Sequence, residues 1–392
     1  MIMREIYLDN SATTRMSDGA LKKYNEAVNT LLGNPSSLHR AGFLAEREIE
    51  SARGAIRKSI RAEGAEVIFT ASGSEANNLA ILGHALSKER YMQKHAKIII
   101  TEGEHASVRE PAMHLKSLGF EVIEIPTKKG KIDNVSLISA LDERVILVSF
   151  MMVNNESGAL YDLPSVANLI KKLAPEALFH VDATQSYMKI PFTKGAIGAD
   201  MITLSSHKIG GPMGVGALVV DSRVIKSHGL SPLVYGGGQG AGLRSGTENL
   251  PGILAFAEAV REGTAQINER TSKLYSLRSY LIEKIKASEA LSDVDITLPS
   301  LHAPHILNIT LPKIKSETML HYLSSEGIYV SSGSACSSHG GESHSALVAY
   351  GRSAAEADCS IRISFSHENK DEDVDALVAA LESGISRLAR IR

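Results

Sequence analysis

The chain has 392 residues, of which 43% are hydrophobic and 22% charged, so it can bury a large core. Its 42 Lys and Arg residues against 44 Asp and Glu residues give a formal net charge of -2, and no basic surplus favours nucleic acid as a partner. The sequence holds no apolar run long enough to span a bilayer, and MIMREIYLDN lacks the pattern of a secretion signal. We therefore expect a cytoplasmic protein without a membrane or nucleic-acid role.

Seven apolar runs rich in β-branched residues alternate with amphipathic stretches between about residues 65 and 220. This alternation is typical of a mostly parallel sheet that is covered by helices. The predicted strands are 67–71, 98–101, 122–125, 145–149, 178–182, 201–205 and 215–220. Predicted helices include 163–173 and 45–60, and the second carries an apolar stripe that should face the core, formed by Ile49, Ala52, Ile56 and Ile60.

The last third of the chain has a different pattern. Residues 255–287 predict one long charged helix, and short strands are predicted at 306–311, 328–332 and 361–365. A boundary near residue 260 follows. We expect an N-terminal segment near the site, a large domain and a small domain that pack closely, because no Pro/Gly-rich linker separates them. Their predicted ranges are 1–15, 16–260 and 261–392.

Polar residues follow three of the predicted strands, where ligands of open α/β sheets bind. Gly73 and Ser74 begin a helix whose free N–H groups favour a phosphate, although an ordinary N-capped helix has the same pattern. Asp182 ends a second strand, where a buried carboxylate needs a cationic neighbour. Lys208 follows a third strand and precedes glycines, a position that a solvated loop lysine could also occupy.

Together these features supply what pyridoxal 5'-phosphate (PLP) chemistry requires. The lysine amine forms the Schiff base, the aspartate keeps the pyridine nitrogen protonated, and the glycine turn holds the phosphate. Each feature is weak alone, but the combination predicts a PLP enzyme.

Nine motifs occur in the same order as in the NifS/IscS-type cysteine desulfurases, which the chain resembles nearly from end to end. They are LDNSATT at 8–14, NPSS at 34–37, GSEANN at 73–78, EH at 104–105, VNNE at 153–156, HVDATQ at 180–185, SHK at 206–208, RSGT at 244–247 and SSGSAC at 331–336. The resemblance implies the class V aminotransferase family. It also implies the α/β fold of PLP-dependent transferases of fold type I, with a large domain built on a mostly parallel seven-stranded sheet and a smaller C-terminal α/β domain.

The resemblance further implies a role for each site residue. Lys208 would bind PLP and act as a base, and Asp182 would face the pyridine nitrogen. The remaining cofactor-binding residues would be Gly73, Ser74, Ser205 and His207 at the phosphate, His105 stacked on the ring, Gln185 and Asn155 at the ring hydroxyl, and Thr247 from the second subunit of a homodimer. Arg362 would bind the substrate carboxylate, and Asn155 would help to seat the substrate. Without the resemblance, a lone histidine or strand arginine would indicate only an ordinary polar residue or a surface ion pair.

The two cysteines, Cys336 and Cys359, are too few for a disulfide framework. Cys336 lies in the small polar run 331–341, which predicts a mobile loop with an exposed thiol. Cys359 leads into an apolar run and is expected to be buried and structural. The resemblance implies that Cys336 takes the sulfur of L-cysteine as a persulfide, with His105 aiding proton transfer, and that L-alanine is released.

The sulfur would then pass to an acceptor protein, either an iron–sulfur scaffold or a thiolation carrier. The sequence leaves open whether Cys336 also ligates an iron–sulfur cluster transiently, and it predicts no other metal site. A selenocysteine lyase would share nearly every motif, whereas another class V transaminase or lyase would not need the loop cysteine. A scaffold without turnover is disfavoured by the intact Lys208, Asp182, His105 and Cys336.

Two departures from the family pattern are visible. After Ser364 the family often continues with a glycine and an arginine, whereas this chain has Phe365, Ser366 and His367. His339 and His344 also lie in the cysteine loop, where we expect them to be solvated rather than in contact with a metal or an acceptor.

Overall fold

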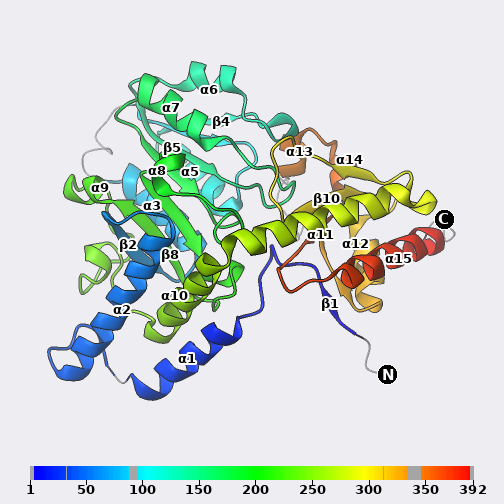
Figure 1. Ribbon diagram of the computed structural model, residues 1–392. Helices are drawn as coiled ribbons and strands as arrows, with labels where there is room; N and C mark the ends of the chain where they lie inside the picture. Colours follow the sequence, from blue (N-terminus) through cyan, green and yellow to red (C-terminus); the bar gives the residue numbers. More distant parts are fainter. Residues whose placement is uncertain (1–3, 32, 88–94, 312, 333–345, 389–392) are drawn as a thin grey trace.

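The computed structural model describes residues 4–31, 33–87, 95–311, 313–332 and 346–388. Within these residues, the largest sheet has seven strands in the order β2-β8-β7-β6-β5-β3-β4 (Figure 1). Their bounds are β2 Ala65–Thr70, β3 Lys97–Thr101, β4 Glu121–Ile125, β5 Val145–Met151, β6 Leu178–Asp182, β7 Met201–Ser205 and β8 Gly216–Asp221. Only β8 runs antiparallel to its neighbours, so the prediction of a mostly parallel seven-stranded sheet is confirmed.

Two hydrophobic cores cover the two faces of this sheet. Successive residues of β8 illustrate the division, since Leu218 belongs to one core and Val219 to the other. Every residue of the central strand β5 is buried, as expected for a parallel strand with helices on both sides. The alternation of apolar runs and helices in the sequence is therefore the consequence of a sheet that is buried on both faces.

Helices of the large sheet pack on both faces (Figure 1). The first core includes residues of α1 Asp18–Thr30, α2 Arg40–Ser59, α7 Leu163–Leu173 and α10 Leu250–Ala265, and the second includes residues of α3 Gly73–Ala85 and α5 Ala106–Ser117. Shorter helices are α6 Asn134–Ala140, α8 Lys194–Ile197 and α9 Ser222–Lys226. The predicted apolar stripe on α2 is confirmed, because Ile49, Ala52, Ile56 and Ile60 are all buried in the first core.

A separate core lies under the C-terminal part of the chain. The four strands β12 Ser331–Ser332, β13 Ser360–Ser364, β10 Ile306–Thr310 and β9 Asp295–Thr297 form an antiparallel sheet in this order. This core includes residues of α11 Ile267–Ala287, α12 Ser316–Ser325 and α15 Asp371–Leu388, and the short helices α13 Ala346–Tyr350 and α14 Ala354–Asp358 lie in the same part of the chain. The N-terminal strand β1 Ile6–Tyr7 pairs with β11 Ile328–Tyr329.

Two expectations from the sequence are wrong. Residues 255–287 form no single helix, because α10 ends at Ala265 and α11 begins at Ile267. The break has a physical reason: α10 packs on α1 and α2, whereas α11 packs on α15 in the other core. Cys359 caps the C-terminus of α14 and is only partly buried, because the apolar strand begins just after it.

The division into domains at residue 260 stays a prediction, and the separate cores favour a boundary close to Gln266. None of the helices in the described ranges combines the length and the apolar character needed to cross a membrane.

Candidate active site

A cavity of about 330 Å³ lies where the carboxyl ends of several strands of the large sheet meet the N-terminal segment and the small sheet. This volume is typical of a site for a small molecule. Ten of the residues predicted from the sequence line it: Gly73, Ser74, His105, Asn155, Asp182, Gln185, Ser205, His207, Lys208 and Arg362. The structure thus brings together side chains that lie up to 289 positions apart in the sequence, from Gly73 to Arg362.

The glycine turn after β2 has the geometry of an anion cradle. Ser72 caps α3 by accepting a hydrogen bond from the N–H of Glu75 at 3.1 Å, and the helix is 13 residues long. A Cβ atom on Gly73 would lie 3.2 Å from Thr184 Oγ1 and 3.4 Å from Ser205 Cβ. Glycine therefore lets the helix start approach the ends of β6 and β7, with its free N–H groups and dipole beside the cavity.

Asp182, at the end of β6, is a buried carboxylate with an exposed fraction of 6%. It accepts hydrogen bonds from Asn77 Nδ2 at 2.8 Å and from the N–H of Thr184 at 2.9 Å. Within the described residues it forms no ion pair with a lysine, arginine or histidine. A buried carboxylate is stabilised by a cationic donor, and a protonated pyridine nitrogen is such a donor.

His105 caps the N-terminus of α5 and lines the same cavity. Its Nδ1 accepts a hydrogen bond from the N–H of Ser107 at 3.1 Å, so a neutral ring carries its proton on Nε2. Burial lowers the pKa of His105; Asp182 opposes this shift, and the charges of Lys208 and Arg362 add to it. The imidazole is therefore neutral at pH 7.

Glu104 fixes the strand end that precedes His105. Its carboxyl accepts hydrogen bonds from Thr101 Oγ1 at 2.7 Å and from the N–H of Met151 at 2.9 Å, so it joins the ends of β3 and β5. Burial raises the pKa of Glu104 to about 8, which leaves the group mostly protonated at pH 7. A neutral carboxyl here adds no second negative charge beside Asp182.

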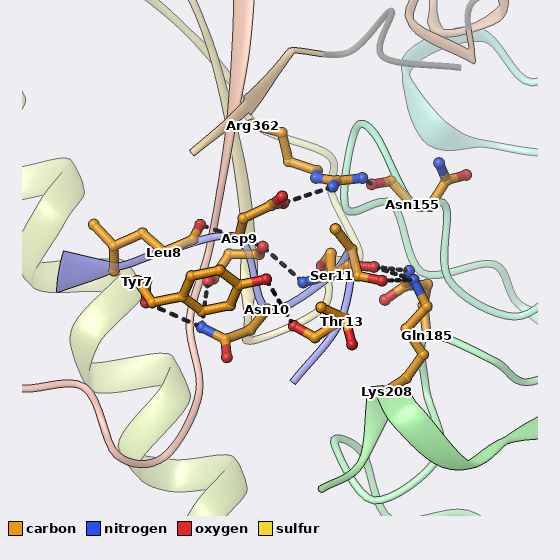
Figure 2. A network of polar contacts seen from close by, with 12 residues as sticks. Tyr7, Leu8, Asp9, Asn10, Ser11, Thr13, Asn155, Gln185, Lys208 and Arg362 are labelled. Atoms are coloured by element: carbon orange, nitrogen blue, oxygen red, sulfur yellow. Dashed lines mark hydrogen bonds and ion pairs between the residues drawn. The ribbon is translucent and has the colours of Figure 1, made fainter. Parts of the chain in front are cut away.

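Lys208 ends the short 3-10 helix η2 Ser206–Lys208, directly after β7. Its ammonium donates hydrogen bonds to the backbone oxygens of Ser11 at 2.5 Å and Ala12 at 2.6 Å (Figure 2). Burial, followed by the charge of Lys208, lowers the pKa of the adjacent His207 to about 4. The N-terminal segment thus holds the lysine through carbonyl groups rather than through a carboxylate.

Arg362 comes from β13 and reaches the cavity from the opposite side. Its Nη1 donates to the backbone oxygen of Asn155 and its Nη2 to Asp9 Oδ1, both at 2.9 Å (Figure 2). Its Nε is buried and has no hydrogen-bond acceptor among the described residues. Gln185 donates from its Nε2 to the backbone oxygen of Ser11 at 3.0 Å, so the same segment contacts the large sheet as well.

Sequence reasoning missed several residues of the site. Asn77 holds both Asp182 and Ser107, with 2.8 Å for each hydrogen bond. Its position one helical turn after Gly73 was the signal that could have identified it. The carbonyls of Ser11 and Ala12 left no such signal, because a backbone oxygen is the same in every residue.

Two predicted residues are not part of this cavity as described. Thr247 is exposed and does not line it. Cys336, together with His339 and His344, lies outside the described residues, but Ser331 and Ser332 line the cavity and Cys336 follows four positions after Ser332. No group of three or more His, Cys, Asp or Glu side chains that could bind a metal occurs in the described part of the chain.

Residues 6–377 match the aminotransferase class-V family. The chain belongs to the class V aminotransferases. A NifS/IcsS protein homolog of Lactobacillus delbrueckii subsp. bulgaricus is 37% identical over 98% of each chain, and cysteine desulfurase IscS 1 of Archaeoglobus fulgidus is 36% identical over 97% of each. A solved structure named NifS-like protein superposes with a TM-score of 0.89 at 33% identity, covering 98% of this chain and 100% of the other.

Class V aminotransferases of this kind depend on PLP, and the residues present fit that cofactor. The close approach at Gly73 suits the phosphate, the buried Asp182 suits the pyridine nitrogen, and Lys208 supplies the amine. Fold type I is likewise shown by the match to the NifS-like structure over nearly the whole chain.

The buried histidine His180 predicts a pH dependence of stability. Its ring contacts Ser149 Oγ at 2.8 Å and Thr203 Oγ1 at 2.9 Å, and burial lowers its pKa to about 4 although Asp182 opposes the shift. Below pH 6.5 this histidine binds a proton in the unfolded chain but stays neutral in the folded chain. The free energy of unfolding should therefore fall as the pH drops from 6.5 to 4. His180→Gln should reduce this slope by up to about 1.4 kcal/mol per pH unit in urea denaturation series.

The exposed His321 provides the control, because its side chain is 81% exposed. His321→Gln should leave the slope as it is in the parent chain. An unchanged slope in His180→Gln would show that this histidine is not held neutral by the fold.

Proposed function

We propose that this chain is a cysteine desulfurase, which converts L-cysteine to L-alanine and transfers the sulfur to Cys336 as a persulfide. One observation carries the proposal: a single cavity joins the anion cradle at Gly73, the buried Asp182 and the amine of Lys208 with the strand that leads to Cys336. The relatives named cysteine desulfurase support it over nearly their full length. A transaminase would use the same cofactor residues without a cysteine at this point of the chain.

PLP, when bound, withdraws electrons from the α-carbon of the amino acid and so permits loss of the α-proton and weakening of the Cβ–S bond. Asp182 would keep the proton on the pyridine nitrogen. The Lys208 amine, which now donates to the carbonyls of Ser11 and Ala12, would remove the α-proton. His105 is neutral and would carry a proton on Nε2 to or from the substrate sulfur.

Cys336 would attack the substrate sulfur as a thiolate. A sulfur–sulfur bond then forms as the Cβ–S bond breaks, and the carbon takes the bonding pair and a proton to become the methyl group of alanine. The persulfide would be passed to an acceptor protein, either an iron–sulfur scaffold or a thiolation carrier.

Cys336→Ala tests the sulfur step. This variant should keep the absorbance of bound PLP and its spectral change with L-cysteine, yet release no sulfide in the presence of a thiol reductant. Cys359→Ala is the matched control and should keep full activity, since Cys359 caps a helix outside the cavity. Normal sulfide release from Cys336→Ala would refute the assignment of the nucleophile.

Arg362 is proposed to bind the substrate carboxylate. Its guanidinium lines the cavity, and its Nε has no acceptor within the described residues although it is buried. Asp9 holds the other side of the guanidinium in an ion pair of 2.9 Å, which fixes the orientation of the planar group. A carboxylate could therefore meet a preoriented partner.

Arg362→Lys should lower kcat/KM for L-cysteine by about 10- to 100-fold, chiefly by raising KM, because a lysine cannot form the paired hydrogen bonds of a guanidinium. The measurement is steady-state alanine formation over a range of L-cysteine concentrations. Arg223→Lys, at a side chain that is 64% exposed, is the control. A fall in kcat alone, with KM unchanged, would contradict a role in binding the carboxylate.

A homodimer with shared sites is part of the proposal. Thr247 is exposed in one chain and away from the cavity of that chain, as expected if it completes the phosphate site of a second subunit. Tyr235, in the segment between α9 and α10 that also contains Thr247, is 78% exposed.

Mixed dimers test whether Thr247 acts across the interface. Refolding Lys208→Ala chains with Thr247→Ala chains should regenerate one intact site per mixed dimer and restore activity. In a mixed dimer of the double variant Lys208→Ala/Thr247→Ala with the parent chain, the only site that has Lys208 should lack Thr247. If Thr247 acted within its own chain, the second mixture would be the more active one.

A further inference from the structure

A second cavity lies on the other side of the N-terminal segment. Its volume is about 30 Å³, and Asn10, Thr14, Arg15 and Ser17 of that segment form one wall. The rest of the lining comes from Met188 and Lys189 after β6, from Ile209 and Gly210 after η2, from Arg270 and Leu274 on α11, and from Ser366, His367 and Glu368 after β13. The cavity is therefore separate from the proposed active site, and its lining includes three cations and one carboxylate, besides His367.

Lys189 is the unusual member of this lining. Its exposed fraction is 7%, and its ammonium forms neither a hydrogen bond nor an ion pair with any described residue. Lys97, which is exposed to 3%, shows how this protein otherwise buries a lysine: its Nζ donates to Asp142 Oδ2 at 2.7 Å and to the backbone oxygen of Ala140 at 3.0 Å. Burial of an ammonium without an acceptor is unfavourable, so Lys189 requires a partner in the cavity that the described residues do not provide.

The surroundings of Lys189 are also positively charged. Burial, then the charges of Arg270 and Lys208, lower its pKa to about 8, so it remains mostly protonated at pH 7. His367 lies near the same cations. Burial lowers its pKa to about 4, and the charges of Arg270, Lys189 and Lys273 contribute to this shift. The ring is therefore neutral and can donate one N–H. The carboxylates of Glu262, Glu368 and Glu269 act on Arg270, but none of them pairs with Lys189.

His305 gives an independent indication of the same field. It is fully buried, and neither of its ring nitrogens has a hydrogen-bond partner among the described residues. Burial and then the charges of Lys189, Arg362 and Lys208 hold its pKa well below its usual value. Among the described residues, the buried side chains of Lys189 and His305 thus have no hydrogen-bond partner, and both lie in a positive field.

We propose that this second cavity is a binding site for a small inorganic anion of the size of chloride, held by Lys189 with Arg270 and His367. A cavity of about 30 Å³ has room for roughly two water molecules, which excludes an organic carboxylate with a side chain but accommodates one monatomic anion with a water. Arg15 and Glu368, both exposed, line the side from which the ion can enter.

One residue of this lining, His367, lies in the stretch after Ser364 where this chain departs from the family pattern. The anion would hold Asn10, Thr14, Arg15 and Ser17 of the N-terminal segment. Ser11 and Ala12, which lie between Asn10 and Thr14 in the chain, accept the hydrogen bonds of Lys208. It would therefore act as a structural ion behind the active site.

Two measurements test this site directly. Crystals soaked in sodium bromide should show an anomalous peak in the cavity, within about 3.5 Å of Lys189 Nζ. The Tm of the PLP-loaded protein should be higher in sodium chloride than in sodium gluconate of equal ionic strength, by about 2 °C when chloride is tenfold above its dissociation constant. Neither readout requires activity, so both are independent of the proposed function.

Lys189→Met and Lys97→Met form a matched pair of variants. Lys189→Met should lose the difference between chloride and gluconate and should have a Tm in gluconate at or above that of the parent, because it removes an unpaired buried charge. Lys97→Met should have a lower Tm and keep the chloride effect. Water without anomalous signal in the cavity, or an unchanged chloride effect in Lys189→Met, would overturn the proposal.

Discussion

The burial of Asp182 without a cationic partner among the described residues constrains the other groups around the cavity. The carboxylate sits at the end of β6 with an exposed fraction of 6%, and its hydrogen bonds come from neutral groups, Asn77 and the backbone of Thr184. Its charge is thus left for a ligand that brings a positive donor. The neighbouring acid, Glu104, is held mostly protonated by burial, so it adds no second negative charge beside Asp182.

The N-terminal segment links the large sheet and the small sheet, which meet at the cavity. Its backbone pairs with the small sheet at Ser364 and with the 3-10 helix at His207, and its Asp9 binds Arg362. The carbonyls of Ser11 and Ala12 then receive Lys208. A single extended stretch therefore positions one cation from each side, and a small shift of this stretch would alter both.

The strands and helices that the sequence predicted correctly are those whose bounds follow from the pattern of their side chains. The strands β6 and β7 were placed to the residue, because each is a short buried run that ends in polar residues. The break at Gln266 was missed, because α10 and α11 both favour helix locally, and only their packing on different cores separates them. Tertiary packing overrode local propensity there.

The same distinction applies within the site. Residues with characteristic chemistry, such as Asp182, Lys208 and His105, could be found from motifs, whereas Asn77 and the carbonyls of Ser11 and Ala12 act through geometry that only the fold creates. Lys189 is the clearest case. In the sequence it is one lysine among many, and its significance arises from being buried beside Arg270 without the acceptor that Lys97 has in Asp142.

The contrast between these lysines suggests a division of charge across the N-terminal segment. Lys208, on one side, donates to two neutral backbone oxygens, and in the proposed mechanism such acceptors would release the amine more readily than a carboxylate would. Lys189, on the other side, adds a positive charge that helps to lower the pKa of His305 and of His367, and an anion would compensate this charge. A bound anion would balance the charge of Lys189 without a second fixed carboxylate near Asp182. Asp182 would then still require a cationic ligand.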